Sequence, residues 1–194
     1  GGPWRGAKAT WLDVAGQTEK LDPHNTNTTV TTAVTKAFYQ GLYAFDKDLK
    51  IKPVLAESQT VSKDGLVYTF KLRAGVKFHD GTDFNAEAVK VTLDRVTNLD
   101  NKLARINQFN RIDKVEVASP LSVRITLKEP FAPFLNSLAH AQAAMIPPAP
   151  PKKYGHKDMP HNPVGTGPST LRKGNHTVSA QARPLISAWQ KGHP

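Results

Sequence analysis

The sequence predicts an α+β fold that contains an antiparallel hairpin. Residues 66–72, "LVYTFKL", alternate apolar and polar side chains, as expected for a strand with one buried face. Residues 85–98 carry apolar side chains at helical spacing. Residues 115–127 contain two short β-type runs around Ser119-Pro120, a pattern typical of an antiparallel hairpin. A chain of 194 residues has room for one domain or little more.

A first helix is expected between residues 31 and 43, after a polar loop that begins at Asp22-Pro23. Its apolar face would be formed by Val34, Phe38 and Leu42. The segment 46–54 then starts with two aspartates that indicate a turn. It continues with the apolar residues Leu49, Ile51 and Val54, which predict a strand or an extended edge.

The central strand and helix follow from local signals. "SKDG" at 62–65 supplies the turn before the strand. Asn85 can cap the following helix, and Glu87 lies favourably near its positive N-terminal end. The buried face of that helix would hold Ala86, Val89, Leu93 and Val96. We expect the helix to end near Asn98, and we predict no regular structure for the proline-rich chain beyond residue 147.

The formal net charge is +10, and it is concentrated late in the chain. From Lys152 to Pro194 there are seven basic residues and only one acidic residue, which leaves +4 for the rest. No zinc-finger spacing and no basic run with interleaved aromatics is present, so a nucleic-acid partner is disfavoured. Solvated lysines explain the charge more simply.

Compartment and membrane signals are weak. The chain has no cysteine, so it forms no disulfide, and its start lacks a signal-peptide pattern, as expected for a mature or processed chain. The longest uncharged stretch, 130–151, contains six prolines and several polar residues. Such a stretch is not expected to span a membrane as a helix.

The strongest candidate for a metal or catalytic site is the sequence "HDGTD", which contains His79, Asp80 and Asp83. These residue types can bind a metal or relay protons. Asp80-Gly81 is, however, a turn signal, and Asp83 can serve the start of the helix that follows. A structural turn is therefore favoured over a ligand or catalytic role.

Other signs of catalysis are missing from the sequence. His156 and His161 lie in an apparent loop without acidic support, so incidental exposure is favoured for both. The sequence contains no G-x-S-x-G elbow, no P-loop and no dinucleotide fingerprint. We therefore expect a binding protein rather than an enzyme, with no metal and no cofactor.

Residues 55–95, "LAESQTVSKDGLVYTFKLRAGVKFHDGTDFNAEAVKVTLDR", resemble the signature of the family 5 extracellular solute-binding proteins. These are the peptide, glutathione and nickel receptors of ABC importers. "LDPHNTNTT" upstream and "VRITLKEPFAPFLNSLA" and "NPVGTGP" downstream match in order. By these motifs the resemblance covers residues 21–168.

The resemblance implies the first lobe of a type II periplasmic-binding-protein fold, with a mixed sheet and hairpins. It implies an extracytoplasmic receptor, in the periplasm or at the outer face of the cytoplasmic membrane. Such a receptor binds short peptides or glutathione in an interlobe cleft and delivers them to an ABC permease. No reaction chemistry and no nucleic-acid partner are expected, and the residues of "HDG" would belong to the scaffold.

The family's chains are more than twice as long, so we expect this lobe to be incomplete, through truncation or an imperfectly determined sequence. Residues 1–20 match the family's motifs poorly. Residues 21–168 are expected to be a portion of the first lobe. Residues 169–194 form a basic tail for which the sequence predicts no structure.

The resemblance also implies where a ligand would contact this lobe. The family's cleft is lined by a loop after "LDP", a loop after the helix and the segment after "PFLNSLA". These correspond here to Asn27, Thr28, Asn107, Gln108, His140, Gln142 and Met145. Five of the seven have a structural alternative: a helix cap for the first pair, an exposed loop for the second and core packing for Met145.

Two other functions stay open at this point. One is a small basic protein that binds acidic surfaces or nucleic acid through its tail, with affinity that falls steeply with salt. The other is a hydrolase with an unfamiliar arrangement around His79.

Overall fold

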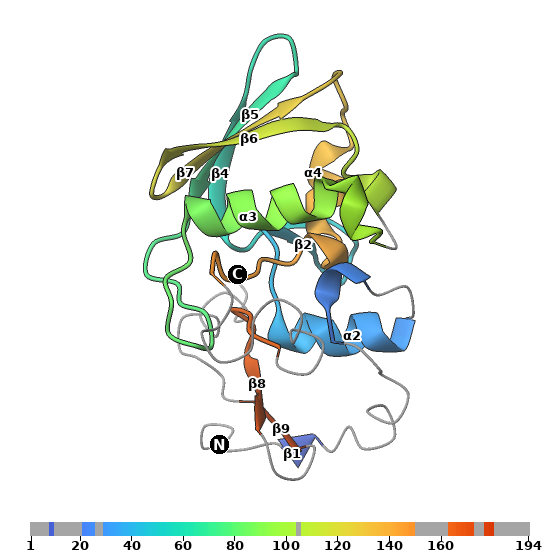
Figure 1. Cartoon of the computed structure of the whole chain (residues 1–194), viewed down its shortest axis with the longest axis vertical. Coiled ribbons are helices and arrows are strands. Elements are labelled where there is room, and N and C mark those ends of the chain that lie inside the picture. Colours follow the sequence, from blue (N-terminus) through green and yellow to red (C-terminus); the bar gives the residue numbers. More distant parts are fainter. Residues whose placement is uncertain are drawn as a thin grey trace.

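A computed structural model describes residues 8–9, 21–25, 29–103, 106–149, 163–172 and 177–180. Its largest sheet has four antiparallel strands in the order β4 (Ala56–Val61), β5 (Val67–Leu72), β7 (Ser122–Leu127) and β6 (Ile112–Ser119). Two hairpins, β4–β5 and β6–β7, are joined by the pairing of β5 with β7. Figure 1 shows this sheet at the top of the molecule.

One face of this sheet forms the core. Tyr68 lies opposite Ile125 and Phe70 opposite Val123, and all four side chains are buried. Helix α3 (Ala86–Thr97) packs against β6 and β7 and runs across the sheet (Figure 1). Helix α4 (Phe134–Ala139) contacts β2 (Tyr43–Phe45) and β3 (Ile51–Pro53), and the ring of Phe134 meets that of Tyr68 edge-on with 4.9 Å between ring centroids.

The predicted cap and face of α3 are confirmed. The side chain of Asn85 accepts a hydrogen bond from the Ala88 amide at 3.1 Å, which satisfies one of the unpaired donors of the first turn. The four expected apolar residues are all buried. The helix ends at Thr97, and the amide of Asn98 donates to the Asp94 carbonyl.

The first described helix, α2 (Thr29–Phe38), ends earlier than the predicted Tyr43. The reason is that the Phe38 carbonyl, which would accept from the Leu42 amide if the helix continued, accepts from the Gly167 amide instead. Tyr43 instead begins β2 (Tyr43–Phe45), which pairs with β3 (Ile51–Pro53). Leu42 is buried, but outside the helix.

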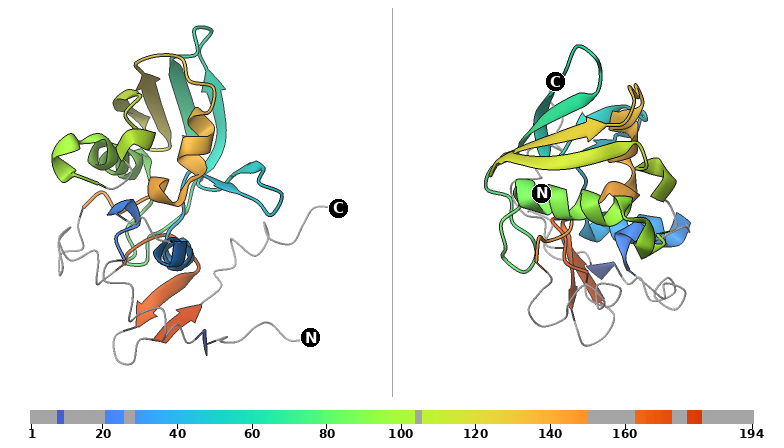
Figure 2. Two further views of the ribbon diagram at one scale, coloured as in Figure 1. Left: turned by 90° about the vertical axis from the view of Figure 1, so that its right-hand side faces the viewer. Right: turned by 45° about the horizontal axis from the view of Figure 1, so that its top comes forward.

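A second small sheet lies beyond α2, on the side away from the four-stranded sheet (Figures 1 and 2). It contains β1 (Lys8–Ala9), β9 (Thr177–Ala180) and β8 (Ser169–Arg172), all antiparallel. Strands therefore occur in part of the basic tail, for which the sequence predicted no structure.

Four short 3-10 turns complete the described elements. They are η1 (Pro23–Asn25), η2 (Leu99–Asn101), η3 (Ile106–Gln108) and η4 (Ala141–Ala143). Within the described ranges, no helix has the length and apolar character needed to cross a membrane.

Candidate ligand cavity

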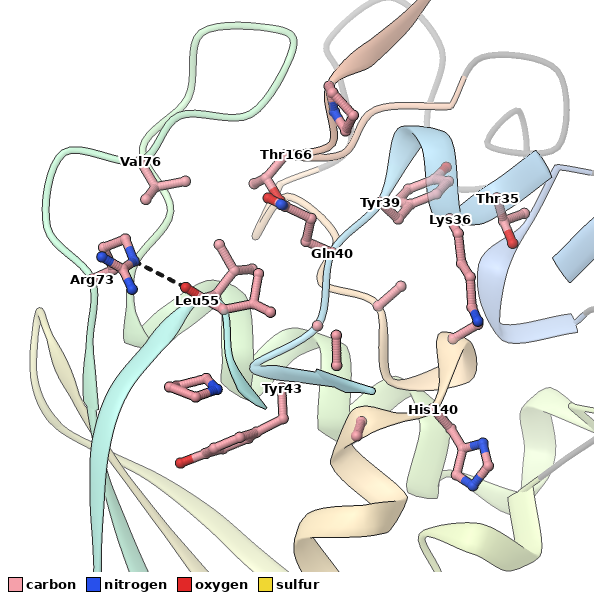
Figure 3. A pocket seen from close by; sticks show the side chains of 18 of the residues that line it. Thr35, Lys36, Tyr39, Gln40, Tyr43, Leu55, Arg73, Val76, His140 and Thr166 are labelled. Carbon is pink, nitrogen blue, oxygen red and sulfur yellow. Dashed lines mark hydrogen bonds between the residues drawn. The ribbon is translucent and has the colours of Figure 1, made fainter. Parts of the chain in front are cut away.

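A cavity of about 530 Å³ lies between the end of α2, the start of β4 and the α4–η4 region (Figure 3). Its walls come from five places in the chain: the end of α2, strand β2, the link between β3 and β4, residues 73–77 after β5, and the α4–η4 region. Thr166 and Pro168 close another side. This size falls in the range of pockets that hold small molecules.

The wall of the cavity carries positive charge. Lys36, Arg73 and Lys77 all contribute to it, and the described lining includes no aspartate or glutamate. The Nε group of Arg73 donates to the Val54 carbonyl at 2.9 Å, which ties this side chain to the β3–β4 link. The ammonium group of Lys77 pairs with Asp83.

Aromatic side chains supply part of the cavity's apolar surface, beside aliphatic ones such as Leu55 and Val76. Burial raises the pKa of Tyr43 to about 12, so its hydroxyl stays protonated, and it donates to Oε1 of Gln59 at 2.5 Å. The ring of Phe45 meets the imidazole of His140 edge-on, with 5.5 Å between centroids. Apolar walls with a few fixed polar groups are the usual make-up of a small-molecule site.

His79 holds the segment that carries Thr166. Its Nε2 lies 2.8 Å from the Gly167 carbonyl, and its Nδ1 lies 3.3 Å from the Gly165 amide. Its own backbone amide donates to the Gly165 carbonyl at 2.9 Å. A carbonyl accepts and an amide donates, so these partners assign a neutral imidazole with its proton on Nε2. The expected turn at "HDG" is confirmed, with Gly81 at φ 90°.

The segment 163–168 packs tightly against the end of α2. A Cβ atom on Gly165 would lie 2.2 Å from the Phe38 carbonyl oxygen, and one on Gly167 would lie 2.5 Å from the Phe38 carbonyl carbon. The Gly167 amide also donates to the Phe38 carbonyl at 2.8 Å. Glycine is therefore required at both positions so that the backbones can approach.

A buried polar cluster ties η1 to α3 and to η4. Arg95 pairs with Asp22 and contacts Nδ1 of His24, whose Nε2 lies 2.8 Å from the Ala144 carbonyl. Burial, together with the positive charge of Arg95, lowers the pKa of His24 to about 4. Burial acts to raise the pKa of Asp22, but the hydrogen bond and charge of Arg95 outweigh it, so that pKa is lowered. Ala144 lines the cavity, so this cluster supports its wall.

The ligand residues expected from the resemblance are dispersed. Asn27 and Thr28 lie outside the described residues, as do His156 and His161. Asn107 is exposed in η3, whereas Gln108 is half-buried there and its Oε1 has no hydrogen-bond partner in the described part of the chain.

The third expected group lies near the cavity but contributes one residue to its wall. His140 lines the cavity, at the junction of α4 and η4. Gln142 is 5% exposed and does not line it. Met145 is fully buried in the core cluster, in agreement with the packing alternative that the sequence left open.

Sequence reasoning did not find Lys36, Arg73 or Thr166. Lys36 reads as a polar residue of a helix and Arg73 as the residue that ends a strand. The sequence offered no specific signal for them, because most of the excess positive charge lies in residues 152–194. Which of these residues line the same cavity depends on how the β2–β3 hairpin and residues 163–168 pack against the rest of the described chain. Across the described ranges, no group of three or more histidine, aspartate or glutamate side chains is arranged to hold a metal ion.

The described fold is a lobe of sheets and helices with a cavity, and the comparisons with known proteins give its family. The chain belongs to the bacterial extracellular solute-binding proteins of family 5: the model described as "family 5 Middle" matches residues 50–182. A relative from Salmonella choleraesuis strain SC-B67, the glutathione-binding protein GsiB, is 50% identical over 192 residues, or 99% of this chain. The similarity thus extends beyond residues 21–168, the range that the motifs indicate.

Solved structures share the fold. The PBP AgaA from A. tumefaciens R10, in complex with agropinic acid, is 32% identical with a TM-score of 0.73, over 81% of this chain and 32% of that one. A dipeptide-binding protein from Pseudoalteromonas sp. SM9913, in complex with Met-Leu, is 27% identical with a TM-score of 0.68, over 80% and 35%. The chain spans 37% of the length of the GsiB relative.

Proposed function

We propose that this chain is the first-lobe portion of a solute-binding component of an ABC importer, and that it binds short peptides or glutathione. The observation that carries the proposal is the 50% identity, across almost the whole chain, to a glutathione-binding protein. The cavity supports it, because its size suits a di- or tripeptide and its wall combines aromatic rings with cationic groups.

In this proposal the protein acts outside the cytoplasmic membrane and hands its ligand to a membrane permease. The lobe would supply one wall of an interlobe cleft, and hinge closure would supply the other. Binding rather than a reaction is the function. The contacts of His79 with the Gly165 and Gly167 backbone support this reading, because they employ both ring nitrogens in the scaffold.

Calorimetric titration tests the proposal. The chain would be titrated with reduced glutathione, a panel of di- and tripeptides, and duplex DNA at about 50 and about 200 mM salt. We expect saturable binding of glutathione or peptides and no salt-sensitive DNA binding. Binding of DNA that weakens steeply with salt, with no response to any peptide, would instead support a small basic protein acting through its tail.

A further inference from the structure

The charged side chains in the described cavity wall are predominantly cationic. Two of the cations, Lys36 and Arg73, come from different elements. Lys36 lies in the last turn of α2, and Arg73 directly follows β5. Both side chains are exposed at the cavity wall. Figure 3 shows them on opposite sides of the cavity, with Gln40, Leu55 and Tyr43 between them.

The surrounding carboxylates cancel only part of this charge. Asp83 pairs with Lys77. Glu57 is bonded to Lys71 at 2.8 Å and also feels the charge of Arg73. Among the described residues, no carboxylate pairs with Lys36.

Arg73 is oriented for recognition of a planar anion. Its Nε is held by the Val54 carbonyl, which fixes the plane of the guanidinium group. No hydrogen bond from its two terminal nitrogens is found within the described residues. A guanidinium group presents such paired donors in the geometry that matches a carboxylate.

We propose that the cavity selects solutes that carry more negative than positive charge, with Arg73 and Lys36 as the specificity-determining residues, each of which binds a ligand carboxylate on its own side of the cavity. This inference rests on the proposed function and narrows its ligand class. Glutathione fits the class, because it has two carboxylates and one ammonium group at neutral pH. A tripeptide such as trialanine has one of each and does not.

The test compares ligands of matched size and different charge. The 194-residue chain would be titrated with reduced glutathione, trialanine and glutathione diethyl ester. We expect glutathione to bind most tightly, and its affinity to fall with added salt because exposed charges are screened.

Variants then locate the selectivity. Arg73→Gln and Lys36→Gln are each expected to weaken glutathione binding about three- to tenfold, as partly solvated charge pairs do. Their affinity for trialanine, which carries one carboxylate and one ammonium group, should fall less than that for glutathione. Arg73→Lys, which keeps the charge, should retain part of the affinity. Lys63→Gln, an exposed lysine outside the cavity, serves as the matched control.

The outcomes separate the two proposals. Equal affinities for glutathione and trialanine, or glutathione affinity that survives both glutamine variants, would overturn the charge selectivity while leaving a peptide-binding protein. Failure of the folded chain to bind any of the peptides would overturn the proposed function and this inference together.

Discussion

The imidazole of His79 lies 2.8 Å from the carbonyl oxygen of Gly167, a contact between residues 88 positions apart in the sequence. His79 is of a residue type common in catalytic and metal sites, but its role here is structural. It connects the cavity wall at 163–168 to the turn that precedes α3. Because Gly167 in turn bonds the end of α2, three separate segments depend on one side chain.

Replacing His79 with alanine is expected to lower the free energy of unfolding by about 1–3 kcal/mol. The Gly167 carbonyl and the Gly165 amide, both in buried residues, would lose their partner, and an unsatisfied buried polar group costs that amount. Urea unfolding monitored by circular dichroism would measure the change.

Asp83→Ala is the matched control in the same turn. Asp83 is exposed, and its ion pair with Lys77 is solvated, so we expect a change within about 0.5 kcal/mol. Equal losses for the two variants would contradict the special role of His79.

Gly167→Ala is expected to lower the free energy of unfolding by on the order of 3 kcal/mol, because the added Cβ would overlap the Phe38 backbone. Gly75→Ala provides the comparison. Its φ of 72° is strained for alanine, but nothing lies within 4 Å of the added carbon, so about 1 kcal/mol is expected. Thermal melts of the two variants should therefore differ clearly, and a smaller loss for Gly167→Ala would show that the α2 contact is not tight.

Acid is expected to destabilise the protein through His24 as the pH falls from about 6.5 to about 4. In that window the unfolded histidine, with the usual pKa of 6.5, binds a proton, whereas the buried one does not. Stability therefore rises with pH across the window. One pKa unit corresponds to about 1.4 kcal/mol, so the full effect is on the order of 3 kcal/mol. Asp22, with its pKa lowered from 3.8, adds a further loss only below that value.

The variant His24→Gln isolates this effect. Its amide can still donate to the Ala144 carbonyl, but it does not titrate. Chemical denaturation of both proteins at several pH values should show a shallower slope for the variant between pH 4 and 6.5. Parallel curves would exclude His24 as the source of acid sensitivity.

Removal of the α3 cap should have a moderate effect. Asn85→Ala is expected to cost about 1 kcal/mol, since the Ala88 amide loses its acceptor. Asn85→Ser, which can still cap, should restore most of the stability in the same urea assay. A full loss in the serine variant would indicate that some other contact of Asn85 matters more.

Local patterns predicted the centre of the fold because local forces determine it. The strand at 67–72 and the helix at 86–97 each carry their period and their cap within a few residues. Strand β4 was not predicted, because most of its side chains are exposed and its sequence "AESQTV" lacks an apolar alternation. Its existence depends on pairing with β5.

The end of α2 and the cavity wall could not be predicted for a related reason. Tyr39 still bonds as in a helix, but Gln40 pairs with Met145, more than a hundred residues away in sequence. Competition between a local turn and a distant partner is invisible to periodicity. The family motifs mark residues of the family's cleft, and these include His140 but not Arg73. Which side chains line this cavity depends instead on how distant segments pack together.

The order of strands in the main sheet also has a consequence for how quickly the chain folds. Each hairpin closes a short loop, but the seam between β5 and β7 joins Phe70 to Val123 and must wait until the intervening helix is placed. Closing such a loop costs entropy before any contact repays it. We expect this seam to form late, so Val123→Ala should speed unfolding while leaving the refolding rate nearly unchanged in stopped-flow experiments. Slower refolding in that variant would show that the seam nucleates the fold.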